Sequence, residues 1–83
     1  MNLRLISIAG PLAGSTFALG AAPATLGRHG GCDLQIRDLA VSRQHCVLAP
    51  EAGRFVLRDL DSRHGTFVNG VPVHERVLEP GDR

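Results

Sequence analysis

The chain of 83 residues contains no segment with a sustained helical period, and turn signals interrupt it at short intervals. Residues 9–14, 50–53 and 69–70 are rich in the glycine, proline and asparagine that favour tight turns. Short runs of apolar and branched residues lie between these turns. Many short strands with regular turn signals are typical of a β-sandwich or a β-barrel. The sequence therefore predicts an all-β fold.

The clearest hairpin signal in the chain is Asn69-Gly70, which lies between two short apolar runs. Both central residues of a type I′ turn need a positive φ, which asparagine and glycine tolerate. Pro72 follows this turn and has no backbone N–H to donate, so it predicts an edge or unpaired position. A four-residue loop, 50–53, is expected to join two further strands. The predicted strands are Leu3–Ile8, Thr16–Leu19, Ala24–Leu26, Leu34–Ile36, His45–Ala49, Phe55–Leu60, Thr66–Val68 and Val71–Val73.

The length and charge of the chain exclude several classes of function. A chain of 83 residues is long enough for one domain with a marginal core. The net charge of +1 argues against a general binder of nucleic acid or membranes, which would carry a basic stripe. All nine basic residues are arginine, so the chain has no Walker A lysine and no lysine for a Schiff base. Tyr and Trp are also absent, which disfavours base stacking on single-stranded nucleic acid.

The two cysteines and the apolar N-terminal region do not indicate a metal site or an export signal. Cys32 and Cys46 lack the paired spacing of zinc ligands, so we expect no metal and no cofactor. Free cysteines favour a reducing compartment, and the expected localisation is cytoplasmic. Gly10, Pro11 and Gly14 interrupt the apolar run early, and the unbroken length that a membrane helix needs is not reached.

Three polar runs lie where the sequence predicts loops between strands. They are residues 26–28 (Leu-Gly-Arg), 41–45 (Val-Ser-Arg-Gln-His) and 61–70 (Asp-Ser-Arg-His-Gly-Thr-Phe-Val-Asn-Gly). Binding residues concentrate on loops that a rigid scaffold positions. Arginine forks and hydroxyl groups are the donors that phosphate oxygens accept from, often in charge-assisted and bidentate pairs. Chemistry alone therefore suggests a small β domain that captures a phosphate group.

These runs, in this order and spacing, resemble forkhead-associated (FHA) domains. The likeness rests on residues 27–28, Ser42-Arg43-x-His45, Asp59-Leu60-x-Ser62, 65–66, 69–70, Leu78 and 81–82. It covers nearly the whole chain, and each run alone would be weak. The resemblance implies a two-sheet β-sandwich that binds phosphothreonine peptides. It also suggests the N-terminal FHA domain of a bacterial signalling or transcription-regulatory protein.

The resemblance implies a role for each matching residue. Arg28 and Ser42 would contact the phosphate, and Arg43 and Arg63 would supply further positive charge to the phosphate or to flanking acidic residues. His45 would form hydrogen bonds that hold the loops in place. The remaining residues would support the binding loops, and they are Gly27, Gly65, Thr66, Asn69 and Gly70.

The chain departs from the family pattern at two places. His64 stands where the family usually has an asparagine that clamps the peptide main chain with both a donor and an acceptor. A neutral histidine also offers one donor and one acceptor, but with a different reach. The family sandwich has about two more strands after 81–82, inside a sheet. We therefore expect residues 1–83 to form one FHA domain whose last strands lie beyond Arg83, although domain swapping or oligomerisation could also cover the open edge.

The predicted function is a non-catalytic module that binds proteins phosphorylated on threonine by Ser/Thr kinases, without direct contact to nucleic acid or membrane. An alternative is an FHA-like scaffold for protein interaction or self-association that no longer needs phosphate. His64 favours this alternative, whereas Arg28 and Ser42 oppose it. Ser42, His45 and Asp59 resemble a hydrolase triad in composition only, because no nucleophile elbow or oxyanion loop accompanies them.

Overall fold

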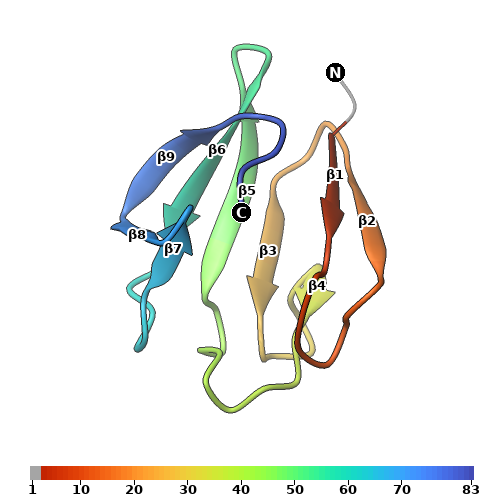
Figure 1. Ribbon diagram of the computed structural model, residues 1–83, viewed down its shortest axis with the longest axis vertical. Coiled ribbons are helices and arrows are strands. Elements are labelled where there is room, and N and C mark those ends of the chain that lie inside the picture. The colour runs from red at the N-terminus through yellow and green to blue at the C-terminus, as the bar shows by residue number, and fades with distance from the viewer. Residues whose placement is uncertain (1–2) are drawn as a thin grey trace.

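The computed structural model describes residues 3–83 as an all-β fold. Its strands are β1 (Leu3–Ile6), β2 (Thr16–Leu19), β3 (Ala24–Gly27), β4 (Leu34–Gln35), β5 (Cys46–Glu51), β6 (Arg54–Asp59), β7 (Thr66–Val68), β8 (Val71–Val73) and β9 (Glu75–Leu78). Strands β4-β3-β5-β6-β9 form a five-stranded sheet, and the hairpins β1-β2 and β7-β8 form two smaller sheets (Figure 1). The all-β prediction is confirmed, and the predicted strands agree with the observed ones to within two residues.

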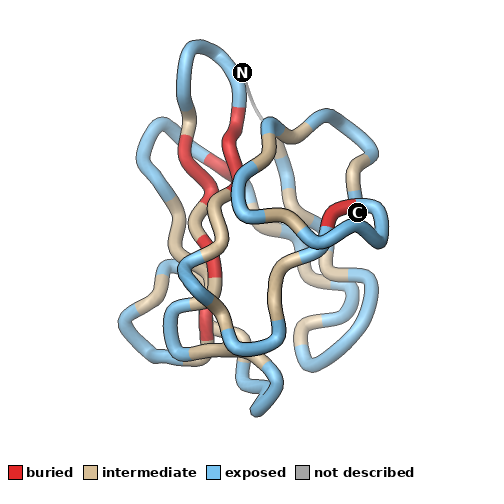
Figure 2. The backbone as a smooth tube through the Cα atoms, turned by 90° about the vertical axis from the view of Figure 1, so that its left-hand side faces the viewer, coloured by how far each residue is buried: buried red, intermediate tan, exposed pale blue. Residues whose placement is uncertain are grey.

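The core lies between the five-stranded sheet and the two hairpins. Its buried members come from both layers, with Leu48 and Phe55 on the large sheet and Leu19 and Val68 on the hairpins. Buried positions lie along the strands, whereas the loops are largely exposed (Figure 2). The core is small, and no described side chain falls below 2 % exposure. This agrees with the marginal core that is expected for a chain of this length.

The hairpin between β5 and β6 has a shorter turn than the sequence predicts. The predicted loop covers residues 50–53, but Pro50 pairs with Phe55 inside the ladder, and only Ala52 and Gly53 form the turn. Both turn residues have a positive φ, 51° and 77°. This is the type I′ geometry that matches the twist of paired strands. The four-residue prediction was wrong because an alanine at positive φ is uncommon and gives no sequence signal.

Strand β9 was not predicted from the sequence. It is separated from β8 by His74 alone, so no turn residue marks its beginning. It pairs antiparallel with β6, and Leu78 lies opposite Phe55 at the edge of the core. Its existence depends on this pairing with a strand that lies about twenty residues earlier in the chain.

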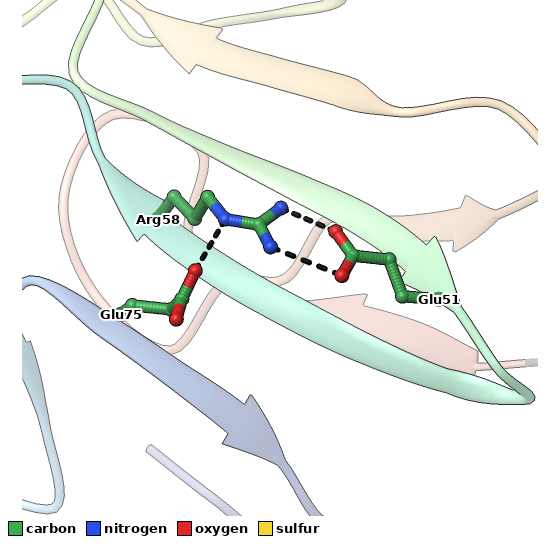
Figure 3. A network of polar contacts seen from close by, with 3 residues as sticks. All are labelled: Glu51, Arg58 and Glu75. Carbon is green, nitrogen blue, oxygen red and sulfur yellow. Dashed lines mark hydrogen bonds and ion pairs between the residues drawn. The ribbon is translucent and has the colours of Figure 1, made fainter.

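The outer face of the five-stranded sheet carries an ion-pair network on β5, β6 and β9. The guanidinium of Arg58 contacts both carboxylate oxygens of Glu51 and one oxygen of Glu75 (Figure 3). Hydrogen bonds from Arg58 hold the pKa of Glu51 below its ordinary value. All three side chains are more than a third exposed, so each pair contributes little to stability. The network forms because the register of the three strands brings Glu51, Arg58 and Glu75 together on this face.

A groove of about 280 Å³ lies between β1 and β7 on the inner side of the large sheet. Among the described strands, β1 pairs only with β2 and β7 only with β8, so each has one unpaired edge. Residues 79–83 border the groove, and the N–H of Asn69 donates to the carbonyl oxygen of Arg83 at 2.6 Å. The unpaired backbone N–H and C=O groups of a strand edge are stabilised when another strand pairs with them. We propose that two further strands, as predicted from the family resemblance, fill this groove and join β1 to β7.

Extending the chain beyond Arg83 by two strands with alternating apolar residues should raise the melting temperature by roughly 10 °C or more, because each kcal/mol of stability shifts a domain of this size by several degrees. Thermal unfolding by circular dichroism measures the shift. The control is an extension of equal length in which the apolar positions are serine. Equal melting temperatures for the two extended chains would contradict this account of the groove.

Candidate functional site

Three loops gather at one end of the five-stranded sheet. Strands β3 and β6 both run antiparallel to β5. The last residues of β3 and β6 therefore lie beside the first residues of β5, at the same end of the sheet. The loops that follow or precede these ends are 28–33, 36–45 and 60–65, all at the lower end of Figure 1. They carry the predicted phosphate-binding residues. The topology therefore brings together segments that lie far apart in the sequence.

The first loop is fixed to the second by hydrogen bonds from Arg28 and His29. The N–H of Arg28 donates to the carbonyl of Ser42 at 2.9 Å, and the N–H of His29 donates to the carbonyl of Arg43 at 3.1 Å. The side chain of Arg28 is half-buried, and its Nε donates to the carbonyl of Val41 at 3.1 Å. These contacts direct the guanidinium and leave its two terminal NH₂ groups available to a ligand.

Gly27 is required by the close approach of the second loop. A Cβ atom at this position would lie 2.2 Å from the carbonyl oxygen of Arg43 and 2.9 Å from the Sγ of Cys32. Both distances are shorter than any real contact, and the nearest atom belongs to the backbone. A larger residue at this position would therefore push Arg43 and the adjacent Ser42 away from Arg28. Gly27 is needed because a side chain would not fit at this position, and not because its backbone adopts a turn conformation.

Ser42 joins the second loop to the third. Its Oγ accepts a hydrogen bond from the backbone N–H of Arg63 at 2.9 Å. A hydroxyl group has one hydrogen to donate in addition to its acceptor lone pairs. The bond from Arg63 occupies an acceptor position, so the hydroxyl hydrogen remains available to a phosphate oxygen.

His45 connects the second loop to the third with its two ring nitrogens. Its Nδ1 accepts from the N–H of Ser42 at 3.1 Å, and its Nε2 lies 2.8 Å from the carbonyl oxygen of Gly65. Because Nδ1 accepts, the arrangement fits the tautomer with its hydrogen on Nε2, which then donates to the carbonyl of Gly65. The backbone of His45 also accepts from the N–H of Leu60. With both nitrogens engaged by the backbone, the ring does not serve as a base for the Ser42 hydroxyl.

Asp59 organises the third loop, a role that the sequence did not assign to it. Its carboxylate accepts from the N–H of Ser62 at 3.1 Å, from the hydroxyl of Ser62, and from the hydroxyl of Thr66 at 2.7 Å. Partial burial alone would raise the pKa of Asp59, but the hydrogen bonds from Ser62 and Thr66 outweigh it and hold the pKa below its ordinary value. The spacing Asp-x-x-Ser, typical of side-chain capping of a turn, could have revealed this role.

The other predicted residues occupy different places. Arg43, Arg63 and His64 are exposed on the second and third loops, where their side chains can reach a ligand. Asn69 and Gly70 form the expected type I′ turn, with φ of 52° and 78°. That turn, however, supports the C-terminal segment, since the side chain of Asn69 contacts Asp82 and Arg83 and none of the three loops.

The described residues form no metal centre, and one of the two thiols is buried. No group of three or more His, Cys, Asp or Glu side chains among residues 3–83 is arranged to hold a metal ion. Burial raises the pKa of the Cys46 thiol to about 11, which keeps it protonated at neutral pH. Within the same residues, no helix is long and apolar enough to span a membrane.

Residues 24–83 match the sequence pattern of the FHA domain. The chain belongs to the FHA domain family. The match includes all three loops and every residue to which the resemblance assigns a role. The phosphate-binding roles of Arg28, Ser42, Arg43 and Arg63 and the peptide-binding role of His64 remain predictions, which the geometry of the loops supports.

Bacterial regulatory proteins are among the relatives of this FHA domain. The glycogen accumulation regulator GarA of Mycolicibacterium smegmatis is 42% identical over 73 residues, which are 88% of this chain and 46% of that protein. The oxoglutarate dehydrogenase inhibitor of Corynebacterium efficiens is 40% identical over 73 residues, which are 88% of this chain and 51% of that protein. The chain thus spans about half the length of these curated relatives.

Solved FHA domains share the fold. An FHA domain from an analysis of phosphothreonine-dependent interactions has a TM-score of 0.90 and 32% identity, covering 99% of this chain and 83% of that chain. The FHA domain of FhaA, solved in complex with the intracellular domain of Rv3910, has a TM-score of 0.79 and 35% identity, covering 83% of this chain and 76% of that chain. The sandwich prediction is confirmed by these likenesses.

The variant Asp59→Asn should lower the free energy of unfolding by about 1–2 kcal/mol at pH 7, because an amide cannot replace all the hydrogen bonds that the carboxylate accepts. Since the pKa of Asp59 is lower in the folded state, its stabilisation is fully present above the ordinary range of aspartate and is lost as the pH falls through the folded-state pKa. Urea titrations from pH 7 down to pH 3 measure both effects, and the two proteins should converge at low pH.

The matched control for this experiment is Asp61→Asn, which removes the same charge from an exposed residue of the same loop. Asp61 has a φ of 58°, a conformation that asparagine tolerates. We expect this control to leave the free energy of unfolding nearly unchanged. An equal loss in the two variants would mean that loop charge, and not the Asp59 hydrogen bonds, stabilises the third loop.

Proposed function

We propose that this FHA domain binds proteins and peptides that carry phosphothreonine. The observation that supports this most directly is the pairing of Arg28 with Ser42. A backbone hydrogen bond joins the two residues, Arg28 uses only its Nε within the protein, and the Ser42 hydroxyl accepts from Arg63 and can still donate its hydrogen. A phosphate dianion accepts strong, charge-assisted hydrogen bonds from such donors.

The affinity would come from few contacts, because few side chains of the loops can donate to a phosphate. Arg28 and Ser42 would hold two phosphate oxygens, and Arg43 and Arg63 would add attraction from exposed positions. Hydrogen bonds among the loops hold their backbone in place before a ligand arrives, which lowers the ordering cost of binding. We expect dissociation constants in the micromolar range, equivalent to about −8 kcal/mol or weaker.

The cellular role that follows is regulatory and non-catalytic. One relative is named as a regulator of glycogen accumulation and another as an inhibitor of a dehydrogenase. By analogy, this chain would recruit a threonine-phosphorylated protein in the cytoplasm, downstream of a Ser/Thr kinase. Engagement of both His45 nitrogens by the backbone supports a binding role over hydrolysis.

A phosphate-independent scaffold is the second candidate function. His64, at the position that usually clamps the peptide main chain, is the feature that favours it. In that case the loops would contact a partner without the charge-assisted bonds to Arg28 and Ser42. The two functions are distinguished by comparing phosphorylated and unphosphorylated forms of the same peptides.

Arg28→Ala should weaken binding to a phosphothreonine peptide by about tenfold to a hundredfold, the typical value of hydrogen bonds to a charged group. A degenerate phosphothreonine peptide library, titrated by fluorescence anisotropy, provides the measurement. Arg54→Ala is the matched control, because it removes the same charge from an exposed residue. Arg54 is the first residue of β6, at the end of this strand that lies away from the three loops. If Arg28→Ala binds as tightly as the parent, the assigned phosphate site is wrong.

His64→Asn should tighten phosphopeptide binding by about 1 kcal/mol, the usual net value of one hydrogen bond, because it restores the family's amide without touching Arg28 or Ser42. Both proteins are titrated at pH 7.5 with the same peptide, where the phosphate is mainly a dianion. Markedly weaker binding by the variant would show that histidine is itself the ligand contact. Folded proteins that bind no phosphothreonine peptide at all would favour the scaffold function.

A further inference from the structure

The outer face of the five-stranded sheet buries two apolar side chains that do not belong to the core. Ala49 on β5 and Val56 on β6 are only 8 % and 7 % exposed, yet neither is part of the cluster between the sheet and the hairpins. They pair directly across the two strands, on the face opposite to Leu48 and Phe55, because side chains alternate along a strand. Val77 lies opposite Val56 on β9 and is 42 % exposed. The outer face thus carries an apolar row, called the outer row below, that consists of Ala49, Val56 and Val77.

The ion pair between Arg58 and Glu51 explains why two members of the outer row are shielded from water. Because β5 and β6 are antiparallel, Arg58 lies on one side of the row and Glu51 on the other. The Nη2 of Arg58 donates to the Oε1 of Glu51 at 3.0 Å, and Nη1 donates to the other oxygen (Figure 3). Arginine stems cover apolar surface while the charged end stays in water. The two joined side chains, called the Arg58–Glu51 bridge, therefore pass over Ala49 and Val56.

The geometry of the bridge is more strongly specified than its small effect on stability requires. The guanidinium binds both oxygens of Glu51, and its Nε donates to Glu75 from the other side, so Arg58 is held in one orientation. Without this cover, the outer row would be a continuous apolar strip on a sheet face. Two sheets pack face to face through such strips. The same row on two copies of a chain is self-complementary about a two-fold axis.

We propose that the Arg58–Glu51 bridge prevents the outer row from packing against the outer row of a second copy of the chain. The bridge acts as a cover, since it keeps Ala49 and Val56 out of reach and leaves only Val77 exposed. The proposal is independent of phosphate binding, because the bridge uses none of the residues assigned to the phosphate. The face it protects also differs from the unpaired edges of β1 and β7, which belong to the two smaller sheets.

The test is the oligomeric state of the double variant Arg58→Ala/Glu51→Ala, which removes the bridge without changing the net charge. Sedimentation velocity is measured for this variant and the parent over the same range of concentrations. The self-association constant should rise by about tenfold or more, because packing then buries the uncovered side chains. The matched control, Arg37→Ala/Glu79→Ala, removes the same two charges from exposed positions and should sediment like the parent. A bridge-free variant that associates no more than the parent overturns the proposal.

A third substitution locates the surface through which the copies associate. Val77→Arg places a charge in the outer row, so adding it to the double variant should restore the sedimentation of the parent. Association that persists in this triple variant uses another surface, such as the unpaired edges of β1 and β7, and overturns the proposal.

Circular dichroism verifies that each variant is folded. If the double variant does not fold, Glu51→Gln takes its place, because it breaks the ion pair by a nearly isosteric change of one exposed side chain. Glu51→Gln should increase self-association in the same direction, and Val77→Arg should again reverse the increase. Sedimentation of a folded Glu51→Gln chain like that of the parent overturns the proposal.

Discussion

The site depends on the contact between Gly27 and the carbonyl of Arg43. There, the strand that leads to Arg28 crosses the loop that carries Ser42 with no room for a side chain, 2.2 Å from where a Cβ would lie. The same carbonyl accepts hydrogen bonds from the N–H of His29 and from the thiol of Cys32. Arg28 and Ser42 are thus held together by backbone packing, which is stiffer than any contact between their own flexible side chains.

Away from this contact, the loops are held by side-chain hydrogen bonds in place of the backbone hydrogen bonds of a sheet. His45 connects the backbone of the second loop to that of the third, and Asp59 collects the hydroxyls of Ser62 and Thr66. Both residues bind other protein groups, which leaves the proposed phosphate contacts to Arg28 and Ser42. Loops ordered in this way lose little further freedom when a ligand binds, so a few charge-assisted bonds suffice for affinity.

Features set by neighbouring residues were predictable from the sequence, and features set by distant ones were not. Asn69-Gly70 specifies its turn locally, and the loop positions of Arg28 and Ser42 follow from the strands beside them. Strand β9 forms only because β6 offers it an edge, and the turn at 52–53 places an alanine at positive φ because the ladder demands it. The importance of Asp59 likewise depends on hydroxyls that the fold brings to its carboxylate.

The net charge of +1 does not show which charges are paired, but the contacts of the loops do. Asp33 is bound by Thr25, Asp38 by the N–H of Ala40, and Asp59 by its own loop, so none of these carboxylates pairs with an arginine. Among residues 3–83, the ion pairs are those of Arg58 on the outer face of the sheet. The arginines of the loops therefore form no ion pair in the described part of the chain, although Asp33, Asp38 and Asp61 lie on the same loops. A nearly neutral domain can in this way offer unpaired guanidinium groups to one phosphate group, without the extended basic surface that nucleic acids require.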